Sequence, residues 1–203
     1  MTNVLASLQT VDAWTFHVVN RTFQNPLFDL VMPILSTKEY AMAPALALLL
    51  WLGLRYGRRG WLLLAVFVAA VALGDQGTNL LKAVFHRTRP CHVLPDVHLL
   101  AGCTRSFSLP SNHASNMFAI ATVAWLTFRR RRWALFALAA SVAYSRIYLG
   151  VHYPSDVVLG GLWGMAAGWV CSQVAIHMAP GGLESDRQPQ HLDRPKVQPD
   201  HPA

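Results

Sequence analysis

Five apolar runs, each close to the length of a membrane-spanning helix, constrain this sequence more than any other feature. They cover residues 40–56, 60–81, 114–128, 133–151 and 157–179. A helix needs about 20 mostly apolar residues to cross the hydrocarbon of a bilayer. Only 13% of the 203 residues are charged, against about 25% in ordinary soluble proteins. We therefore predict an all-α integral membrane protein with five transmembrane helices.

The segments that flank these runs are more polar. Within residues 11–36, apolar residues are mixed with His17, Asn20, Arg21, Gln24, Asn25 and Asp29. We expect an interfacial helix there, followed by a short or tilted span that would make a sixth crossing. Residues 1–25 are thus assigned to an interfacial N-terminal segment and residues 26–179 to the transmembrane domain. Residues 180–203 hold almost no large apolar residues and many Pro, Gln and charged ones, which predicts a disordered tail.

The positive charge is placed as in a membrane protein. A net charge of +7 would suit nucleic acid, but arginines concentrate in two short turns between apolar runs, at residues 55–59 and 129–132. Arginine-rich short loops stay in the cytoplasm. The two turns are therefore predicted to lie in the cytoplasm, and the connectors 82–113 and 152–156 to face outward. We predict a multi-pass protein of a bacterial inner (cell) membrane, with the tail in the cytoplasm and the outward connectors in the periplasm. Its expected partners are membrane lipids, with no nucleic acid.

Three polar stretches lie at the outward ends of the predicted helices. They are KAVFHRTRP (82–90), LPSNHAS (109–115) and SRIYLGVHYPSD (145–156). Helices that alternate in direction bring these ends to one membrane surface. Taken singly, each stretch has a simpler explanation, such as a helix anchored among headgroups, a helix cap or an interfacial histidine. Together they predict one shared site.

The residue types in these stretches suit an anion. Three positive charges come from Lys82, Arg89 and Arg146. Ser111 suits the N-cap of the next helix, whose first backbone N–H groups, on Asn112 and His113, point outward and attract anions. Fixed positive charge and N–H donors stabilise the transition state of phosphoryl transfer, in which negative charge spreads over the equatorial oxygens. Phosphoryl transfer is therefore the predicted chemistry.

His152 and Asp156 have the arrangement of a nucleophile and its orienting carboxylate. Pro154 suits the first turn of a helix and forces the residues before it into extended geometry. His152 is therefore expected on a loop, and Asp156 in the following helical turn, where its carboxylate can fix the imidazole tautomer. We predict that His152 attacks phosphorus to form a phosphohistidine. His113 would protonate the leaving oxygen and then activate the water that hydrolyses the intermediate.

The order and spacing of these residues resemble a known family. Lys82 to Pro90 matches K-x6-R-P, Pro110 to His113 resembles P-S-G-H, and Ser145 to Asp156 matches S-R-x5-H-x3-D. The pattern is similar to that of the type 2 phosphatidic acid phosphatase (PAP2) superfamily of membrane lipid phosphatases, over residues 25–178.

The resemblance implies a six-helix membrane bundle with both termini in the cytoplasm and the site at the outer membrane surface. It implies hydrolysis without a metal ion or other cofactor. In this pattern His152 is the nucleophile, Asp156 its partner and His113 the general acid. The implied phosphate ligands are Lys82, Arg89, Ser111 and Arg146.

One residue departs from the family pattern. Asn112 stands where the family usually has glycine. Asparagine tolerates left-handed backbone geometry better than most residues, so the backbone donor can persist. Its amide is a candidate contact for a second phosphate or a sugar, and Asn112 is therefore counted with the phosphate ligands.

The outward connector also contains Cys91 and Cys103. In an oxidising periplasm they are expected to form a disulfide that closes a loop of about a dozen residues, which stabilises the fold by about 3 kcal/mol. A metal site that uses Cys91, His92, His98 and Cys103 is the alternative. It lacks any standard ligand spacing, so no metal is predicted.

The substrate is constrained least, because the motif loops bind a phosphate that many lipids share. Since the chain is small and carries no extra domain, we predict hydrolysis of undecaprenyl diphosphate, with phosphatidylglycerophosphate and lipid A phosphates as alternatives. Two other classes are weighed against this: a vanadate-dependent haloperoxidase, which the apolar spans disfavour, and a non-catalytic lipid binder, which the intact histidine pair disfavours. The sequence leaves the oligomeric state open.

Overall fold

The structure is a computed structural model that describes residues 2–128 and 132–178. The predicted disordered tail, 180–203, lies outside these residues, as does most of the second arginine-rich turn. Every regular element in the described part is helical, so the all-α prediction is confirmed there. In chain order the elements are α1 (Thr2–His17), the π-helical turn η1 (Val18–Thr22), α2 (Pro26–Ser36), α3 (Lys38–Tyr56), α4 (Arg58–Phe85), α5 (Pro90–Val93), α6 (Asn112–Thr127), α7 (Arg132–Tyr148) and α8 (Pro154–Met178).

Local sequence signals set several of the helix ends. Asn25 caps α2 by accepting a hydrogen bond from the backbone N–H of Phe28. Gly57, at φ +56°, separates α3 from α4 in a conformation that glycine adopts readily. His86, at φ 48°, ends α4 in left-handed geometry, and its N–H donates to the carbonyl of Lys82. The chain therefore leaves α4 at His86, four residues after Lys82, in the stretch where the sequence predicts site residues.

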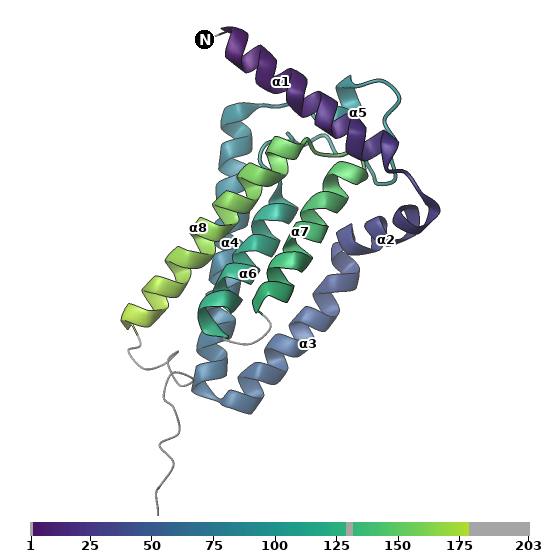
Figure 1. The fold of residues 1–203 in the computed structure, drawn as a ribbon. Coiled ribbons are helices and arrows are strands. Elements are labelled where there is room, and N and C mark those ends of the chain that lie inside the picture. Colours follow the sequence, from purple (N-terminus) through teal and green to yellow (C-terminus); the bar gives the residue numbers. More distant parts are fainter. Residues whose placement is uncertain (1, 129–131, 179–203) are drawn as a thin grey trace, which may run out of the picture.

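The long helices form a bundle, and α1 lies across one of its ends (Figure 1). At that end α4 and α7 finish and α6 and α8 begin, while α3 and α4 are joined at the opposite end. Among the described helices, α6 and α8 share the most extensive contact. Small residues permit this close approach, because a Cβ placed on Gly164 would lie 2.0 Å from the carbonyl oxygen of Ser115.

Two of the described helical segments are long and apolar enough to cross a membrane, Arg58–Val93 and Pro154–Met178. Shorter apolar helices cover Pro26–Ser36 and Leu46–Tyr56, and α6 and α7 have 16 and 17 residues. The predicted count of five or six crossings therefore stays a prediction. Large apolar side chains are exposed on the outside of the bundle, among them Leu54, Leu162 and Trp169, as expected for a surface that contacts lipid.

Candidate active site

The three polar stretches lie together at the end of the bundle that α1 crosses (Figure 1). The backbone N–H of Ser111 donates to the carbonyl of Asp156 at 2.9 Å, which joins the start of α6 to the first turn of α8. The N–H of Ser108 donates to the carbonyl of Arg87 at 2.8 Å, which joins the first stretch to the second. Residues about 70 positions apart in the sequence thus share one site.

His152 and Asp156 form a buried pair. The imidazole is 2% exposed and the carboxylate 0%. Their closest atoms, Nδ1 and Oδ2, are 3.4 Å apart, which is long for a hydrogen bond but common in catalytic sites without substrate. The backbone N–H of Tyr153 donates to the same Oδ2 at 2.8 Å and fixes the carboxylate. The loop and helix predicted from Pro154 therefore produce the expected arrangement.

The other imidazole nitrogen of His152 faces Arg89. Nε2 lies 3.0 Å from Arg89 Nη1, which also donates to the carbonyl of Val151 at 2.9 Å. A guanidinium group can only donate, so Nε2 accepts and the imidazole proton belongs on Nδ1, beside Asp156. This tautomer presents the Nε2 lone pair to the positively charged part of the site.

Burial lowers the pKa of the His152 imidazole from its usual value of 6.5 to about 3, because the charged form loses its hydration. The positive charges of Arg89 and Arg146 act in the same direction, whereas Asp156 acts against them. His152 is therefore neutral at neutral pH, and a neutral imidazole is the form that can attack phosphorus.

Lys82 and Arg89 are buried and held by the same short loop. Lys82 Nζ donates to the carbonyl of Phe107 at 2.7 Å. Arg89 donates from Nε to the carbonyl of Ser106 at 2.8 Å and from Nη2 to its hydroxyl at 2.9 Å. Within the described part of the chain, neither cation forms an ion pair with a carboxylate. Buried charge without a counter-ion favours binding of an anion.

Arg146 is the third cation. Its guanidinium group donates to the hydroxyl of Ser36 in α2, and its carbonyl accepts from the N–H of Val151 and of His152 at 3.2 and 3.3 Å. Its Nε is buried and has no hydrogen-bond partner among the described residues. Because buried polar groups normally have a partner, this nitrogen is available to an anion bound beside the loop.

The hydroxyl of Ser111 is also buried without a partner among the described residues. Ser111 occupies the N-cap position of α6, as predicted, but its side chain makes no cap hydrogen bond. His113, which is half-buried, lies in the first turn of the same helix. Its assignment as general acid stays a prediction.

Asn112 differs from its expectation. It is the first residue of α6 and has ordinary helical geometry, since positive φ occurs among the described non-glycine residues at His86 and Asp96. Its amide nitrogen donates to Asp75 Oδ1 at 2.7 Å and to Asn79 Oδ1 at 3.1 Å. The amide nitrogen therefore joins α6 to α4, and its contact with a second phosphate or a sugar stays a prediction.

Cys91 and Cys103 are placed as a disulfide with their Cα atoms 6.3 Å apart. His92 Nε2 lies 3.3 Å from Cys103 Sγ, so these three residues cluster. Paired cysteines offer no thiolate to a metal, and His98 instead contacts Asp29 Oδ1 at 2.9 Å. Three of the four residues of the alternative metal site therefore lie together, with the two cysteines paired, whereas His98 contacts a carboxylate in α2.

Arg87 was not identified from the sequence. It lies between Lys82 and Arg89, and it donates to Asp156 Oδ1 at 2.8 Å and to Asp12 Oδ2 in α1 at 2.5 Å. Its place inside the K-x6-R-P stretch was the available signal, whereas nothing in the sequence linked Asp12 to the site.

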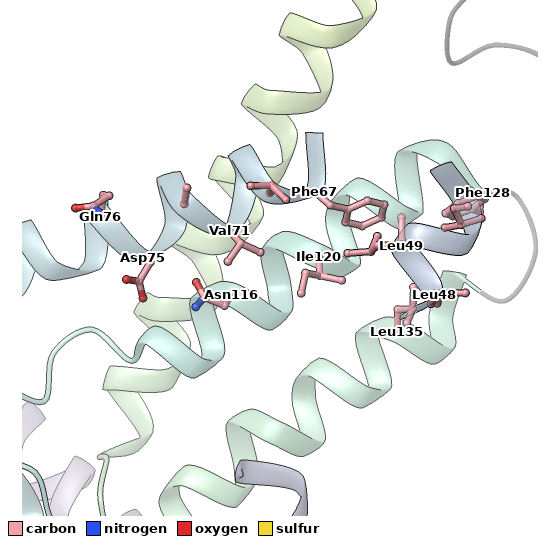
Figure 2. Close-up of a pocket in the computed structure, with 14 residues that line it drawn as sticks. Leu48, Leu49, Phe67, Val71, Asp75, Gln76, Asn116, Ile120, Phe128 and Leu135 are labelled. Atoms are coloured by element: carbon pink, nitrogen blue, oxygen red, sulfur yellow. The ribbon is translucent and has the colours of Figure 1, made fainter. Parts of the chain in front are cut away.

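An apolar groove of about 580 Å³ runs along the bundle between α3, α4, α6 and α7 (Figure 2). Figure 2 shows Asp75, Gln76 and Asn116 at one end of the groove and Phe128 and Leu135 at the other. Because the carboxylate of Asp75 is bonded to the first residue of α6, the polar end of the groove is adjacent to the site.

The sequence profile of the PAP2 superfamily matches residues 59–177. The chain belongs to the PAP2 superfamily. It is 33% identical over 138 residues to a lipid A 4'-phosphatase of Bacteroides thetaiotaomicron, covering 62% of this chain and 61% of that protein. It is 34% identical over 138 residues to an undecaprenyl-diphosphatase of Sulfolobus acidocaldarius, covering 68% and 65%. These matches therefore span less than two thirds of either PAP2 relative.

The fold is also that of a solved member of the superfamily. The crystal structure of a transmembrane PAP2 type phosphatidylglycerolphosphate phosphatase from Bacillus subtilis superposes with a TM-score of 0.68 at 23% identity, covering 86% of this chain and 89% of that one. The chain thus shares its fold with that protein, and two of its described helical segments are long and apolar enough to cross a membrane.

Proposed function

We propose that this protein is a metal-independent membrane lipid phosphatase that works through a phosphohistidine. The observation that carries the proposal is the position of His152, with Nδ1 beside Asp156 and Nε2 beside the guanidinium group of Arg89. A neutral imidazole is thereby oriented toward the place where an anion would be held.

The reaction would proceed in two displacements. His152 Nε2 attacks the terminal phosphorus and forms a P–N bond while the bond from phosphorus to the leaving oxygen breaks, and His113 gives that oxygen a proton. The leaving oxygen is the bridging oxygen of a lipid diphosphate, or the ester oxygen of a lipid monophosphate. His113 then takes a proton from water, whose oxygen attacks the phosphohistidine and releases phosphate and neutral His152. Arg89 would exchange its contact with Nε2 for a phosphoryl oxygen, and Lys82 and Arg146 would bind the other oxygens.

The site is proposed to face the periplasm at the outer surface of the inner membrane, in a bundle of six crossings. The arginine-rich turn at residues 55–59 supports this orientation. It joins α3 to α4 at the end of the bundle opposite the site (Figure 1), and such turns stay in the cytoplasm.

The preferred substrate is undecaprenyl diphosphate, with phosphatidylglycerophosphate and lipid A phosphates as alternatives. The apolar groove in Figure 2 supports a lipid, because a substrate phosphate at the site would place a hydrocarbon chain close to the groove's polar end. The names of the two relatives, an undecaprenyl-diphosphatase and a lipid A 4'-phosphatase, support a lipid phosphate without choosing between these substrates.

The test uses the purified full chain in detergent with EDTA. Each candidate lipid and phosphatidate is supplied separately, and released phosphate is measured. We expect release to continue in EDTA and to be lost in His152→Ala. The matched control is His177→Ala, because His177 is exposed at the far end of α8 and bonds to the Gln173 carbonyl.

A second measurement tests the intermediate directly. Acid-labile, base-stable phosphate should be trapped on the wild-type protein by rapid quenching and should be absent from His152→Ala. Loss of all activity in EDTA, restored by a divalent cation, would contradict the mechanism. Unchanged turnover in His152→Ala would contradict the assignment of the nucleophile.

A further inference from the structure

We propose that Arg87 is a positioning residue for the catalytic pair and that Asp12 in α1 holds it in place, so that α1 is a working part of the active site. The inference rests on the proposed function, because it concerns the same His152 and Asp156. Arg87 occupies one of the unspecified positions of the K-x6-R-P stretch.

Arg87 contacts two helices, α8 and α1, through its two terminal nitrogens. Nη1 donates to Asp156 Oδ1 at 2.8 Å and to the hydroxyl of Ser155 at 2.6 Å, both in the first turn of α8. Nη2 donates to Asp12 Oδ2 in α1 at 2.5 Å. The guanidinium carbon also lies 4.0 Å from the centre of the Tyr153 ring, which favours the cation further. The side chain is thus held from three directions.

The contact with Asp156 decides how the carboxylate faces the nucleophile. Oδ2 accepts from the backbone N–H of Tyr153 and faces His152, whereas Oδ1 accepts from Arg87. Without Arg87, Oδ1 would lose a charge-assisted donor in a fully buried site, and such a group reorients or becomes protonated instead of staying unpaired. Either change removes the acceptor that keeps the His152 proton on Nδ1.

Asp12 connects α1 to α8 as well as to Arg87. It is 8% exposed, and it accepts from the backbone N–H of Ser155 at 2.9 Å and from the Ser155 hydroxyl at 2.5 Å. The first N–H groups of a helix lack intrahelical partners, and a carboxylate there is also favoured by the helix dipole. A residue of α1 therefore caps α8 next to the catalytic carboxylate.

A second contact lies on the same face of α1. Phe16, four residues after Asp12, is fully buried, and its ring centre lies 5.7 Å from that of Tyr153. Residues four apart share one side of a helix, whereas Val11 and Trp14 are exposed. Figure 1 shows α1 across the end of the bundle. Displacing α1 would withdraw Asp12 and Phe16 together, and so release Arg87 and Tyr153.

A guanidinium group is required at this position because it must serve two carboxylates and a hydroxyl at fixed angles. Lysine would keep the charge but could not reproduce the fork. We therefore expect Arg87→Lys to retain part of the activity that Arg87→Gln loses. A purely electrostatic role would make lysine a full replacement.

The experiment compares Arg87→Gln, Arg87→Lys and Asp12→Asn with wild type, using phosphate release per folded protein. Because a misplaced catalytic group of this kind costs about 100-fold, we expect kcat to fall about 100-fold in Arg87→Gln with KM close to wild type. Asp12→Asn should show a smaller fall in kcat. The double variant Asp12→Asn/Arg87→Gln should lose less kcat than the product of the two single effects, because the two residues act through one contact. The matched controls are Arg21→Gln and Asp96→Asn, an exposed pair 4.0 Å apart, which should keep wild-type kcat.

Hydrogen–deuterium exchange supplies a measurement that needs no activity. Backbone amides at the start of α8 should exchange faster in Asp12→Asn than in wild type, and at the wild-type rate in Arg21→Gln. Unchanged exchange in Asp12→Asn, or wild-type kcat in Arg87→Gln, would overturn the inference. If wild type releases no phosphate from any lipid supplied, the proposed function fails, and the exchange result alone decides whether Asp12 and Arg87 hold α8.

Discussion

Replacing Gly164 by alanine should separate α6, which carries His113, from α8, which carries Asp156. An added Cβ would lie 2.0 Å from the carbonyl oxygen of Ser115 in α6, 2.7 Å from its carbonyl carbon and 2.8 Å from its Cα. These are backbone atoms, so no side-chain rotation can relieve the clash. Ordinary van der Waals contact begins at 3.4 Å, so the added Cβ and the carbonyl oxygen must move apart by 3.4 minus 2.0, which is 1.4 Å.

This separation has a calculable effect on stability and on catalysis. Overpacking of this kind costs about 1–3 kcal/mol. Gly164 lies eight residues after Asp156, which is roughly 12 Å along a helix, so the start of α8 moves with it relative to Ser111 and His113. A displacement of about 1 Å costs about 100-fold in rate. We therefore expect kcat to fall by about this factor.

The assay is thermal unfolding in detergent together with phosphate release per folded protein. Gly102→Ala is the matched control, because an added Cβ there meets no atom within 4 Å. Gly161→Ala should be intermediate, since its Cβ would meet the Phe118 ring at 3.1 Å, and a side chain can move. If Gly164→Ala melts and turns over like Gly102→Ala, the close packing of α6 on α8 does not position the site.

Three further predictions concern other parts of the chain. Replacing Cys91 and Cys103 by serine should lower the free energy of unfolding by about 3 kcal/mol, the value for a loop of this length, and reductant should then leave the melting temperature unchanged. The pKa of His152 is lowered to about 3 in the folded protein, so the unfolded chain takes up a proton below about pH 6.5 that the folded chain does not. The free energy of unfolding should therefore fall as the pH drops from about 6.5 toward 3, and it should fall less in His152→Gln. Unfolding measured across this pH range tests the prediction. Asn112→Asp should destabilise the fold because it places a second carboxylate beside that of Asp75. Asn112→Gly should lower the free energy of unfolding by about 2 kcal/mol, since two hydrogen bonds of about 1 kcal/mol each are lost, and it should keep phosphate release. Thermal unfolding and turnover of both variants check this.

The parts of the site that the sequence predicted depend on local spacing. His152 and Asp156 are four residues apart with Pro154 between them, and this spacing alone predicts a loop followed by a helical turn. The convergence of the three polar stretches followed from apolar runs that alternate in direction. The sequence predicts the number of membrane crossings less firmly, because α6 and α7 are shorter than a full span.

The contacts that the sequence could not predict join residues that are far apart in the chain, through groups such as backbone carbonyls that many residues share. Arg89 and Lys82 are held by the carbonyls of Ser106 and Phe107, and every residue has a carbonyl. Asp12 and Arg87 are 75 residues apart, and neither residue type indicates the other. The hydrogen bond from Asn112 to Asp75 was not predicted either, because Asp75 lies on another helix that sequence spacing cannot place beside it.

The hydrogen-bond partners of the basic residues, more than their residue type, separate those proposed to bind phosphate from Arg87, which is proposed to position Asp156. Arg87 contacts two carboxylates, so its charge is already neutralised and an incoming phosphate would have to displace an ion pair. The neighbouring Lys82, Arg89 and Arg146 bond to neutral oxygens in the described part of the chain. A phosphate oxygen can replace a neutral acceptor with a gain in Coulomb energy, because charge-assisted hydrogen bonds are roughly twice as strong as neutral ones. The same end of the bundle therefore holds three cations whose neutral partners an anion could replace, and a fourth cation, Arg87, that is already paired with the carboxylate beside the proposed nucleophile.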